Sequence, residues 1–349
     1  MDKIAIPPRI EKNLADLFNL LQSSKRVVVT THHNPDGDAL GSALAMGLYL
    51  SKKGHQVQVI TPSTHPAFLD WMPGQSMLLV YDDTNLQAVQ EAVNQADLIF
   101  MLDFSVYKRL QGLEKIFASI DRPKVVIDHH LDPTIDADFM LWDVRAASTT
   151  ELVYDFLHLA HDAQFIDIPI AECIYAGVMT DTSSFKHAST TPKVHLMAAE
   201  LMQQGLNTNR IHKLIYDTNT VNRLKLTGFA LKDKLEILTD FRTAYFALSA
   251  SELNQFQHEQ GDTEGLVNYA LSIRDIAFAA IFIERPEGIK MSFRSIGDFP
   301  ANEVARLYFN GGGHKNAAGG ISHQPLQATV DQFLKILPLF KEQLSQATY

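Results

Sequence analysis

The sequence predicts an α/β protein: an N-terminal parallel-sheet domain with a helical cap and connecting helix, followed by a smaller α+β domain. Short apolar runs alternate with helical segments up to about residue 145, which is typical of a parallel sheet covered on both faces. Residues 148–233 have a mostly helical pattern, and strand-like runs return after about residue 235. We therefore expect two domains, 1–235 and 236–349.

The first domain contains five candidate strands, each a short apolar run, and the first of them is rich in β-branched residues. They are expected at 26–31, 57–60, 96–104, 123–130 and 139–142. A helix follows the first of them, with Asp38 expected at its N-cap and Gly54 just past its end. In sheets of this kind, ligands bind at the carboxyl ends of the strands.

The later elements are helices first and a mixture of strands and helices afterwards. Helical patterns cover 149–163, 169–179, 191–205, 208–217 and 221–235. In the second domain, strands are expected at 243–249, 276–284 and 289–295, and helices at about 251–259, 300–309 and 325–345. Because no Pro/Gly/Ser-rich linker separates the domains, the boundary is expected only to within several residues.

Composition places the chain among ordinary globular proteins. Its 349 residues are 46% hydrophobic and 20% charged, and its one cysteine, Cys173, excludes an internal disulfide. No apolar run approaches the roughly 20 residues that a membrane helix needs, and the N-terminus lacks a signal-peptide apolar segment. We expect a cytoplasmic protein that does not bind a membrane.

The net charge of −10 limits the ligands that the chain can bind. There are 27 acidic against 21 basic residues up to residue 235, and 13 against 9 after it. Neither domain therefore offers a long basic track of the kind that binds nucleic acid polymers. Long nucleic acids are excluded, whereas a small anionic ligand held by a local site is not.

Acidic and histidine side chains follow several of the predicted strands. They are His32, Asp36 and Asp38 in HHNPDGD, Asp103, Asp128 with His129 and His130, and Asp181 after a helix. A carboxylate that closes a buried strand either faces the ligand crevice or is paired structurally. Taken alone, HHNPDGD fits a solvated loop and Asp38 fits a helix cap. Four such clusters in one domain instead indicate a functional site.

The chemistry that fits these side chains is a two-metal hydrolase. Imidazole and carboxylate ligands without thiolate suit Mn²⁺, Mg²⁺ or Fe²⁺ better than structural zinc. Two ions sharing a carboxylate and a water make a hydroxide near neutral pH and neutralise the charge that develops on a phosphoryl oxygen. We predict two divalent ions as cofactors, with Mn²⁺ as the first choice and Mg²⁺ as the alternative.

A glycine segment near the C-terminus is a candidate ligand-binding loop. Gly311, Gly312 and Gly313 precede His314 and Lys315, and successive glycines let backbone N–H groups approach an anion closely. Arg294 ends a predicted strand in the same domain. Taken alone, the glycines fit a flexible turn and Arg294 fits a surface residue. Together they predict a wall that binds a phosphate or a base.

These motifs resemble the DHH phosphoesterase superfamily with a DHHA1 C-terminal domain. HHNPDGD, the strand-ending Asp103, IDHH, TDTSSF and NGGGHKNAAGG occur in the family's order, and the resemblance covers about 26–345. Within that superfamily the chain is most similar to the short bacterial oligoribonucleases that also dephosphorylate 3′-phosphoadenosine 5′-phosphate (pAp). Ser183 and Ser184 stand where relatives often have a glycine, a departure that removes no ligand.

The resemblance implies a role for each matching residue. One metal ion would be held by His32, Asp36 and Asp103, and the other by Asp38, Asp103, His129 and Asp181. Asp103 would bridge the ions, Asp128 would orient its neighbours by hydrogen bonds, and His130 would contact substrate or help to protonate the leaving oxygen. Arg109 would contact phosphate, and substrate would also be bound by Arg294, Gly311, Gly312, Gly313 and His314.

The function implied is a phosphoesterase that cleaves short RNA or linear dinucleotides to mononucleotides, or dephosphorylates pAp. An exopolyphosphatase and a RecJ-like single-strand exonuclease are the enzyme alternatives, although the chain has no room for the latter's additional nucleic-acid-binding domain. A family II pyrophosphatase is disfavoured by the GGGH-type second domain. A nucleotide sensor that binds metals without turnover is the alternative outside enzymes. Metal identity, the polarity of RNA degradation and assembly as a homodimer stay open.

Overall fold

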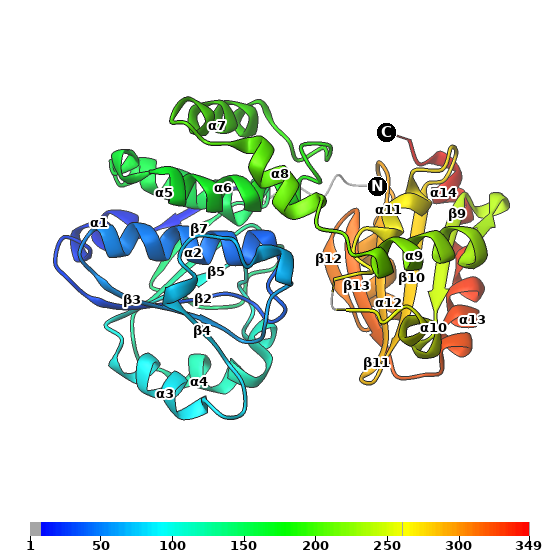
Figure 1. Ribbon diagram of the computed structural model, residues 1–349, viewed down its shortest axis with the longest axis horizontal. Helices are drawn as coiled ribbons and strands as arrows, with labels where there is room; N and C mark the ends of the chain where they lie inside the picture. Colours follow the sequence, from blue (N-terminus) through cyan, green and yellow to red (C-terminus); the bar gives the residue numbers. More distant parts are fainter. Residues whose placement is uncertain (1–7, 260, 349) are drawn as a thin grey trace. The chain divides into compact units, whose positions relative to one another are not determined.

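The computed structural model describes residues 8–259 and 261–348, and the chain divides into two compact units (Figure 1). The units comprise residues 1–218 and 219–349, so the division precedes helix α9 (Val221–Phe229), whereas the sequence placed it after residue 235. Helix α9 belongs to the second unit because its buried Leu226 is part of the same hydrophobic core as Phe246 of that unit. A helical pattern shows that a helix forms, but not which core it joins.

A seven-stranded sheet forms the centre of the first unit. The strands lie in the order β1-β7-β6-β5-β2-β3-β4, and every pair is parallel except β1 with β7. They are β1 (Ile10–Lys12), β2 (Arg26–Thr30), β3 (Gln56–Thr61), β4 (Leu78–Val80), β5 (Leu98–Leu102), β6 (Lys124–Asp128) and β7 (Phe139–Trp142). The predicted parallel sheet is confirmed. The edge strands β1 and β4 were not predicted, because three residues are too few to show a strand pattern.

Helices cover both faces of this sheet (Figure 1). They are α1 (Leu14–Leu20), α2 (Gly37–Lys52), α3 (Leu86–Gln95), α4 (Glu114–Ser119), α5 (Thr149–Leu159) and α6 (Ile168–Asp181), and α7 (Pro192–Gln203) and α8 (Thr208–Tyr216) pack against α6. Side chains of β2 alternate between two cores: Val27 and Val29 pack on the side of α2, α5 and α6, and Val28 on the side of α3 and α4. Burial on both faces explains why β2 and β5 are continuous apolar runs.

The strand order creates a crevice between β2 and β5. Strand β2 pairs with β3 on one side and with β5 on the other, so the connections that leave β2 and β5 run in opposite directions. At such a switch point the loops after the two strands diverge and leave room for a ligand. His32 follows β2 and Asp103 follows β5, so the topology alone places both at this crevice.

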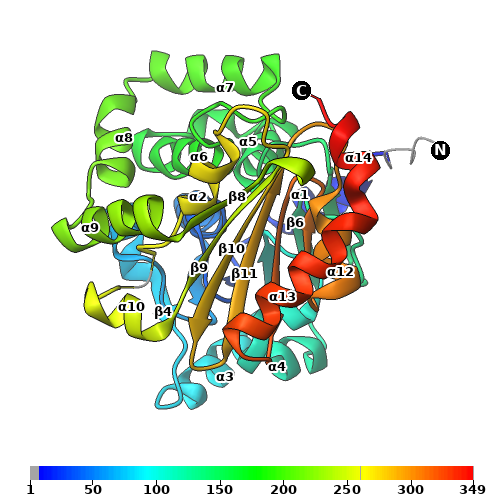
Figure 2. The same cartoon turned by 90° about the vertical axis from the view of Figure 1, so that its right-hand side faces the viewer.

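The second unit contains a six-stranded sheet in the order β12-β13-β11-β10-β9-β8, in which only β9 and β10 are parallel. The strands are β8 (Leu235–Leu238), β9 (Thr243–Leu248), β10 (Phe278–Arg285), β11 (Gly288–Ser295), β12 (Gly312–His314) and β13 (Ala317–Ser322). The remaining helices are α10 (Ala250–Gln255), α11 (Leu266–Leu271), α12 (Ala301–Tyr308), α13 (Leu326–Ile336) and α14 (Lys341–Gln346). Helices α9–α11 pack on one face of the sheet and α12–α14 on the other (Figure 2).

The predicted α+β second domain is confirmed, although strands β8 and β13 and helix α11 were not predicted, and two of the predicted segments differ. The helix expected at 325–345 is divided into α13 and α14 by a short turn at Leu337–Phe340, in which Pro338 lacks a backbone donor. Part of the expected glycine loop is strand β12, which pairs with β13. Among the described residues, no helix is long and apolar enough to cross a lipid bilayer.

Candidate metal centre

The carboxyl ends of β2, β5 and β6 and the adjoining ends of α2 and α6 bring the predicted ligands together. Potential ligand atoms lie within 4.8 Å of one another in His32, Asp36 and Asp103 and in Asp38, His129 and Asp181, the two ligand groups considered below, and also in Asp103, Asp128 and His130. Asp103 adjoins both groups, because its Oδ2 is 3.3 Å from His32 Nε2 and its Oδ1 is 3.6 Å from His129 Nε2. The six side chains therefore form one continuous cluster with Asp103 at its centre.

Asp36, and not Asp38, is the N-cap of helix α2. Asp36 Oδ1 accepts hydrogen bonds from the backbone N–H groups of Asp38 and Ala39, at 3.1 and 3.0 Å. The N-cap expected at Asp38 was therefore wrong by two residues. Both aspartates have a residue type and a spacing that fit a cap, and the local sequence does not distinguish them.

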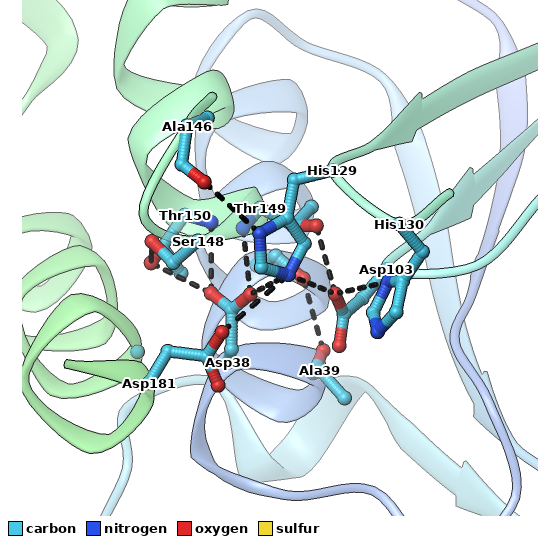
Figure 3. A network of polar contacts seen from close by, with 12 residues as sticks. Asp38, Ala39, Asp103, His129, His130, Ala146, Ser148, Thr149, Thr150 and Asp181 are labelled. Atoms are coloured by element: carbon cyan, nitrogen blue, oxygen red, sulfur yellow. Dashed lines mark hydrogen bonds and ion pairs between the residues drawn. The ribbon is translucent and has the colours of Figure 1, made fainter. Parts of the chain in front are cut away.

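Asp38 instead accepts hydrogen bonds from the first turn of helix α5 (Figure 3). Its Oδ2 lies 2.6 Å from the backbone nitrogen of Thr149, and its Oδ1 lies 2.8 Å from both the backbone nitrogen and the Oγ1 of Thr150. These N–H groups have no partner inside their own helix, and the positive end of the helix dipole favours a carboxylate there. Helix α5 thus fixes the orientation of a carboxylate that is only 1% exposed.

The two histidines of the cluster direct the same ring nitrogen at the carboxylates. His129 Nδ1 lies 3.2 Å from the carbonyl oxygen of Ala146, and His32 Nδ1 lies 2.9 Å from that of His33. A carbonyl oxygen only accepts, so each Nδ1 carries a proton and Nε2 is the ring nitrogen that faces the carboxylates; when the ring is neutral, that Nε2 can offer its lone pair to a metal ion. This second-sphere arrangement is common among histidines that bind metals.

Burial and mutual repulsion perturb the acids of the cluster. Burial and the charge of Asp103 raise the pKa of Asp38 to about 8. Burial and the charge of Asp38 raise the pKa of Asp181 well above its ordinary value, although 26% of the Asp181 side chain remains exposed. Burial opposes the charging of His129, but the surrounding carboxylates, Asp181 foremost, raise its pKa to about 9. The cluster therefore holds protons that ordinary aspartates would release.

Asp103 is the exception among these acids. Burial alone would raise its pKa, but contact with His32 and the charges of His130 and His129 hold the pKa well below its ordinary value. Its backbone is left-handed, with φ of 66°, a conformation that few residues other than glycine adopt. This turn directly after β5 places the carboxylate between the two ligand groups.

The donor set fits divalent cations. Within residues 8–259 and 261–348, no lysine or arginine forms an ion pair with Asp36, Asp38, Asp103 or Asp181. His32 Nε2 is buried and faces the Asp103 carboxylate, with Oδ2 at 3.3 Å. Several close carboxylates without a lysine or arginine partner, beside imidazole nitrogens, are the chemistry of a site for hard or borderline metal ions.

A second set of side chains adjoins the cluster. His130 Nδ1 donates to Asp128 Oδ1 at 2.8 Å, and the completely buried Asp128 also accepts from the backbone N–H of His130. Burial outweighs this contact and lowers the pKa of His130. Arg109 Nη1 donates to the backbone carbonyl of Asp103 at 3.1 Å. The structure therefore brings a histidine–aspartate pair and a guanidinium to the edge of the cluster.

The predicted residues of the second unit lie together within that unit. Arg294 on β11 and His314 on β12 both pair with Ala317 on β13, so their side chains project from the same face of the sheet. Gly311 and Gly313 are required by the fold, because an added Cβ would lie 2.0 Å from the Gly319 carbonyl oxygen and 2.6 Å from that of Ala317. At Gly312, no atom lies within 4 Å of an added Cβ among the described residues.

Sequence reasoning missed the residues that hold the ligands in place. Thr149 and Thr150 were taken only as the start of a helix, for which threonine is an ordinary residue. Gly177 on α6 was not singled out, although an added Cβ there would lie 2.8 Å from Asp38 Oδ1. Cys173 is buried, as expected, and it forms no disulfide. The only available signal was a pair of threonines directly after a serine at a helix start.

Comparisons with known proteins give concordant matches to both units. The family described as "DHH family, N-terminal domain" matches residues 26–178, and the "DHHA1 domain" matches residues 243–345. A crystal structure of an exopolyphosphatase-related protein from Bacteroides fragilis is 34% identical, covers 99% of this chain and 100% of its own, and superposes with a TM-score of 0.90.

Two named relatives are also similar along most of their lengths. The bifunctional oligoribonuclease and PAP phosphatase NrnA of Thermus thermophilus is 28% identical, and the match covers 100% of both chains. The protein of the same name from Bacillus subtilis is 26% identical, over 87% of this chain and 91% of the relative. The matches therefore extend through both units, including the segments that carry the cluster.

Proposed function

Because this chain belongs to the DHH family and carries a DHHA1 domain, we propose that it is a metal-dependent phosphoesterase acting on short nucleotide substrates. The reaction proposed is hydrolysis of short oligoribonucleotides or linear dinucleotides to mononucleotides, together with removal of a phosphate from pAp. The observation that carries the proposal is the pair of ligand groups that adjoin at Asp103. The names of the Thermus and Bacillus relatives support the same substrates.

The two groups are proposed to hold two divalent ions, with Mn²⁺ preferred to Mg²⁺. His32, Asp36 and Asp103 would bind one ion, and Asp38, Asp103, His129 and Asp181 the other. Each group contains an imidazole, and Mg²⁺ prefers oxygen ligands more strictly than Mn²⁺ does. Bound divalent ions supply Lewis acidity, which activates water and neutralises charge on a phosphoryl oxygen.

The remaining side chains are proposed to bind the phosphate and to supply a proton. Arg109 would hold phosphate oxygens, since its guanidinium lies beside the Asp103 backbone at the edge of the cluster. His130, oriented by Asp128 through Nδ1, would contact the substrate, or would take up a proton at Nε2 and pass it to the leaving sugar oxygen. Arg294 and His314, which share one face of the second sheet, would bind the base or a second phosphate, with Gly312 leaving room for the ligand.

An exopolyphosphatase is the second candidate function. The Bacteroides structure at 34% identity is described as exopolyphosphatase-related, and polyphosphate presents the same phosphoryl group to the metal centre. The net charge of −10 favours short substrates over long polyanions of either kind. The two candidates therefore differ in whether a nucleoside is recognised.

A substrate panel separates these functions. Purified protein is supplied in turn with pAp, a linear diribonucleotide, RNA of two to five nucleotides, single-stranded DNA and polyphosphate, each with Mn²⁺ and with Mg²⁺. We expect release of phosphate from pAp and of mononucleotides from the short RNAs over many turnovers. An Asp103→Asn variant serves as the control and is expected to be inactive. Hydrolysis of polyphosphate alone would favour the second candidate, and binding without turnover would make the protein a nucleotide sensor.

A further inference from the structure

One residue of helix α5 contacts both carboxylates around which the two ligand groups are arranged. The backbone N–H of Thr149 donates to Asp38 Oδ2 at 2.6 Å, and its hydroxyl donates to Asp103 Oδ1 at 2.8 Å (Figure 3). Asp38 belongs to one ligand group, and Asp103 adjoins both. Thr149 therefore links, through two hydrogen bonds, two carboxylates that lie 65 residues apart in the sequence.

The hydrogen bonds determine which lone pairs of Asp38 remain available. Each carboxylate oxygen has about two lone-pair sites. Asp38 Oδ1 accepts from the backbone nitrogen and from the hydroxyl of Thr150, which uses both of its sites. Asp38 Oδ2 accepts one hydrogen bond among the described residues, from Thr149, and keeps one site on the side of His129 Nε2, which lies 3.8 Å away. This count leaves Asp38 able to bind a metal ion through Oδ2 alone.

Counting the lone-pair sites of Asp103 in the same way shows that both of its carboxylate oxygens remain able to bind a metal ion. Its Oδ1 accepts one hydrogen bond, from the Thr149 hydroxyl, and keeps a second lone-pair site on the side of His129. Its Oδ2 faces His32. Asp103 can therefore bind on both sides at once, with the Thr149 hydroxyl fixing the rotation of the carboxylate that makes this possible.

The hydroxyl of Thr149 is not needed to cap helix α5. Ser148 is the N-cap, and its Oγ accepts a hydrogen bond from the backbone N–H of Glu151 at 3.1 Å. Thr149 is completely buried, so its hydroxyl is not there to contact solvent. A valine would fill the same volume in a helix first turn. The hydroxyl is thus explained by the carboxylate that it contacts and not by the helix.

We propose that Thr149 is a positioning residue, whose hydroxyl and N–H hold Asp38 and Asp103 in the relative orientation that two divalent ions require. The inference rests on the metal ligands given under the proposed function. It concerns metal binding, and it does not depend on which phosphate ester the protein cleaves. Partners of metal ligands of this kind change metal affinity or activity by about 10–100-fold when they are removed.

The test compares Thr149→Val, which removes only the hydroxyl, with Thr149→Ser, which keeps it. Thr149→Ala is measured in parallel, in case the valine variant does not fold. Thr30→Val is the matched control, because Thr30 is equally buried but its hydroxyl bonds to the Ile60 carbonyl oxygen at 2.9 Å. Mn²⁺ is titrated into each metal-free protein by calorimetry, and the Mn²⁺ dependence of pAp hydrolysis is measured alongside.

We expect Thr149→Val and Thr149→Ala to bind at least one Mn²⁺ about 10–100-fold more weakly, and to need correspondingly more Mn²⁺ for activity. Thr149→Ser and Thr30→Val should bind Mn²⁺ like the unaltered protein. Unchanged Mn²⁺ affinity without the hydroxyl would overturn the proposal, and so would failure of Thr149→Ser to restore it. If the unaltered protein binds Mn²⁺ but cleaves none of the nucleotides, the proposed function fails and the calorimetric comparison still decides the role of Thr149.

Discussion

Replacement of Gly177 by alanine tests whether close helix packing sets the position of Asp38. Gly177 lies on α6, where an added Cβ would be 2.4 Å from Thr150 Cγ2, 2.6 Å from Thr150 Oγ1 and 2.8 Å from Asp38 Oδ1. Carbon atoms in ordinary contact lie about 3.5–4.0 Å apart. The neighbours must therefore move by about 1 Å, and the β-branched Thr150, hydrogen-bonded to Asp38, cannot rotate away without losing that bond.

The expected magnitudes follow from this geometry. Overpacking a core costs about 1–3 kcal/mol, and alanine recovers about 1 kcal/mol over glycine inside a helix. Gly177→Ala should therefore lower the free energy of unfolding by up to about 2 kcal/mol, or the Tm by about 4–8 °C for a unit of this size. A displacement of about 1 Å at Asp38 should lower kcat/KM for pAp by about a hundredfold.

Gly228→Ala on helix α9 provides the control for this experiment. At Gly228 no described atom lies within 4 Å of an added Cβ, so the alanine should stabilise the helix by about 1 kcal/mol and leave activity unchanged. Thermal unfolding and Mn²⁺-dependent hydrolysis of pAp are measured for both variants. If Gly177→Ala is as stable and as active as Gly228→Ala, the packing of α6 does not position Asp38 and the reasoning is refuted.

Three further substitutions test other parts of the account. Asp103→Asn should lower turnover by about a thousandfold with the fold retained by circular dichroism, since about 4 kcal/mol of charge stabilisation is lost; near-full activity would exclude the bridging role. His130→Ala should lower kcat by about 10²–10⁴-fold and leave Mn²⁺ affinity unchanged. The loss of kcat should be smaller for a substrate with a nitrophenolate leaving group, which departs without a proton. An equal loss of kcat for both substrates would exclude proton donation by His130. Gly313→Ala should destabilise the second unit, because φ at this residue is 136° and an added Cβ would meet the Ala317 carbonyl oxygen. Gly312→Ala, the control, should leave thermal unfolding unchanged. Equal stability of the two variants would contradict the claim that the fold requires glycine at residue 313.

The parts of the centre that the sequence predicted are those that depend on local pattern. An apolar, β-branched run that ends in an acid identifies a buried strand and its functional end, which is why Asp103 and Asp128 were found. The parallel sheet then brings such ends to one edge. The clustering of His32, Asp36 and Asp103 follows from that topology, without any knowledge of side-chain contacts.

The parts that were missed depend on contacts between distant segments. Asp36 and Asp38 fit a helix cap equally well, and only the position of helix α5, more than 100 residues later, distinguishes them. Thr149 has no distinctive local signal for the same reason. The domain boundary was placed too late because the amphipathic pattern of α9 is the same whichever core buries Leu226.

The central claim is that the two groups adjoining at Asp103 bind divalent ions that phosphate-ester hydrolysis requires. The most direct measurement is a titration of Mn²⁺ into metal-free protein, with bound metal and release of phosphate from pAp followed in the same samples. We predict two bound equivalents of Mn²⁺, with turnover reaching its maximum only when both are present. Full turnover in the presence of excess chelator, or turnover that saturates without bound metal, would contradict it.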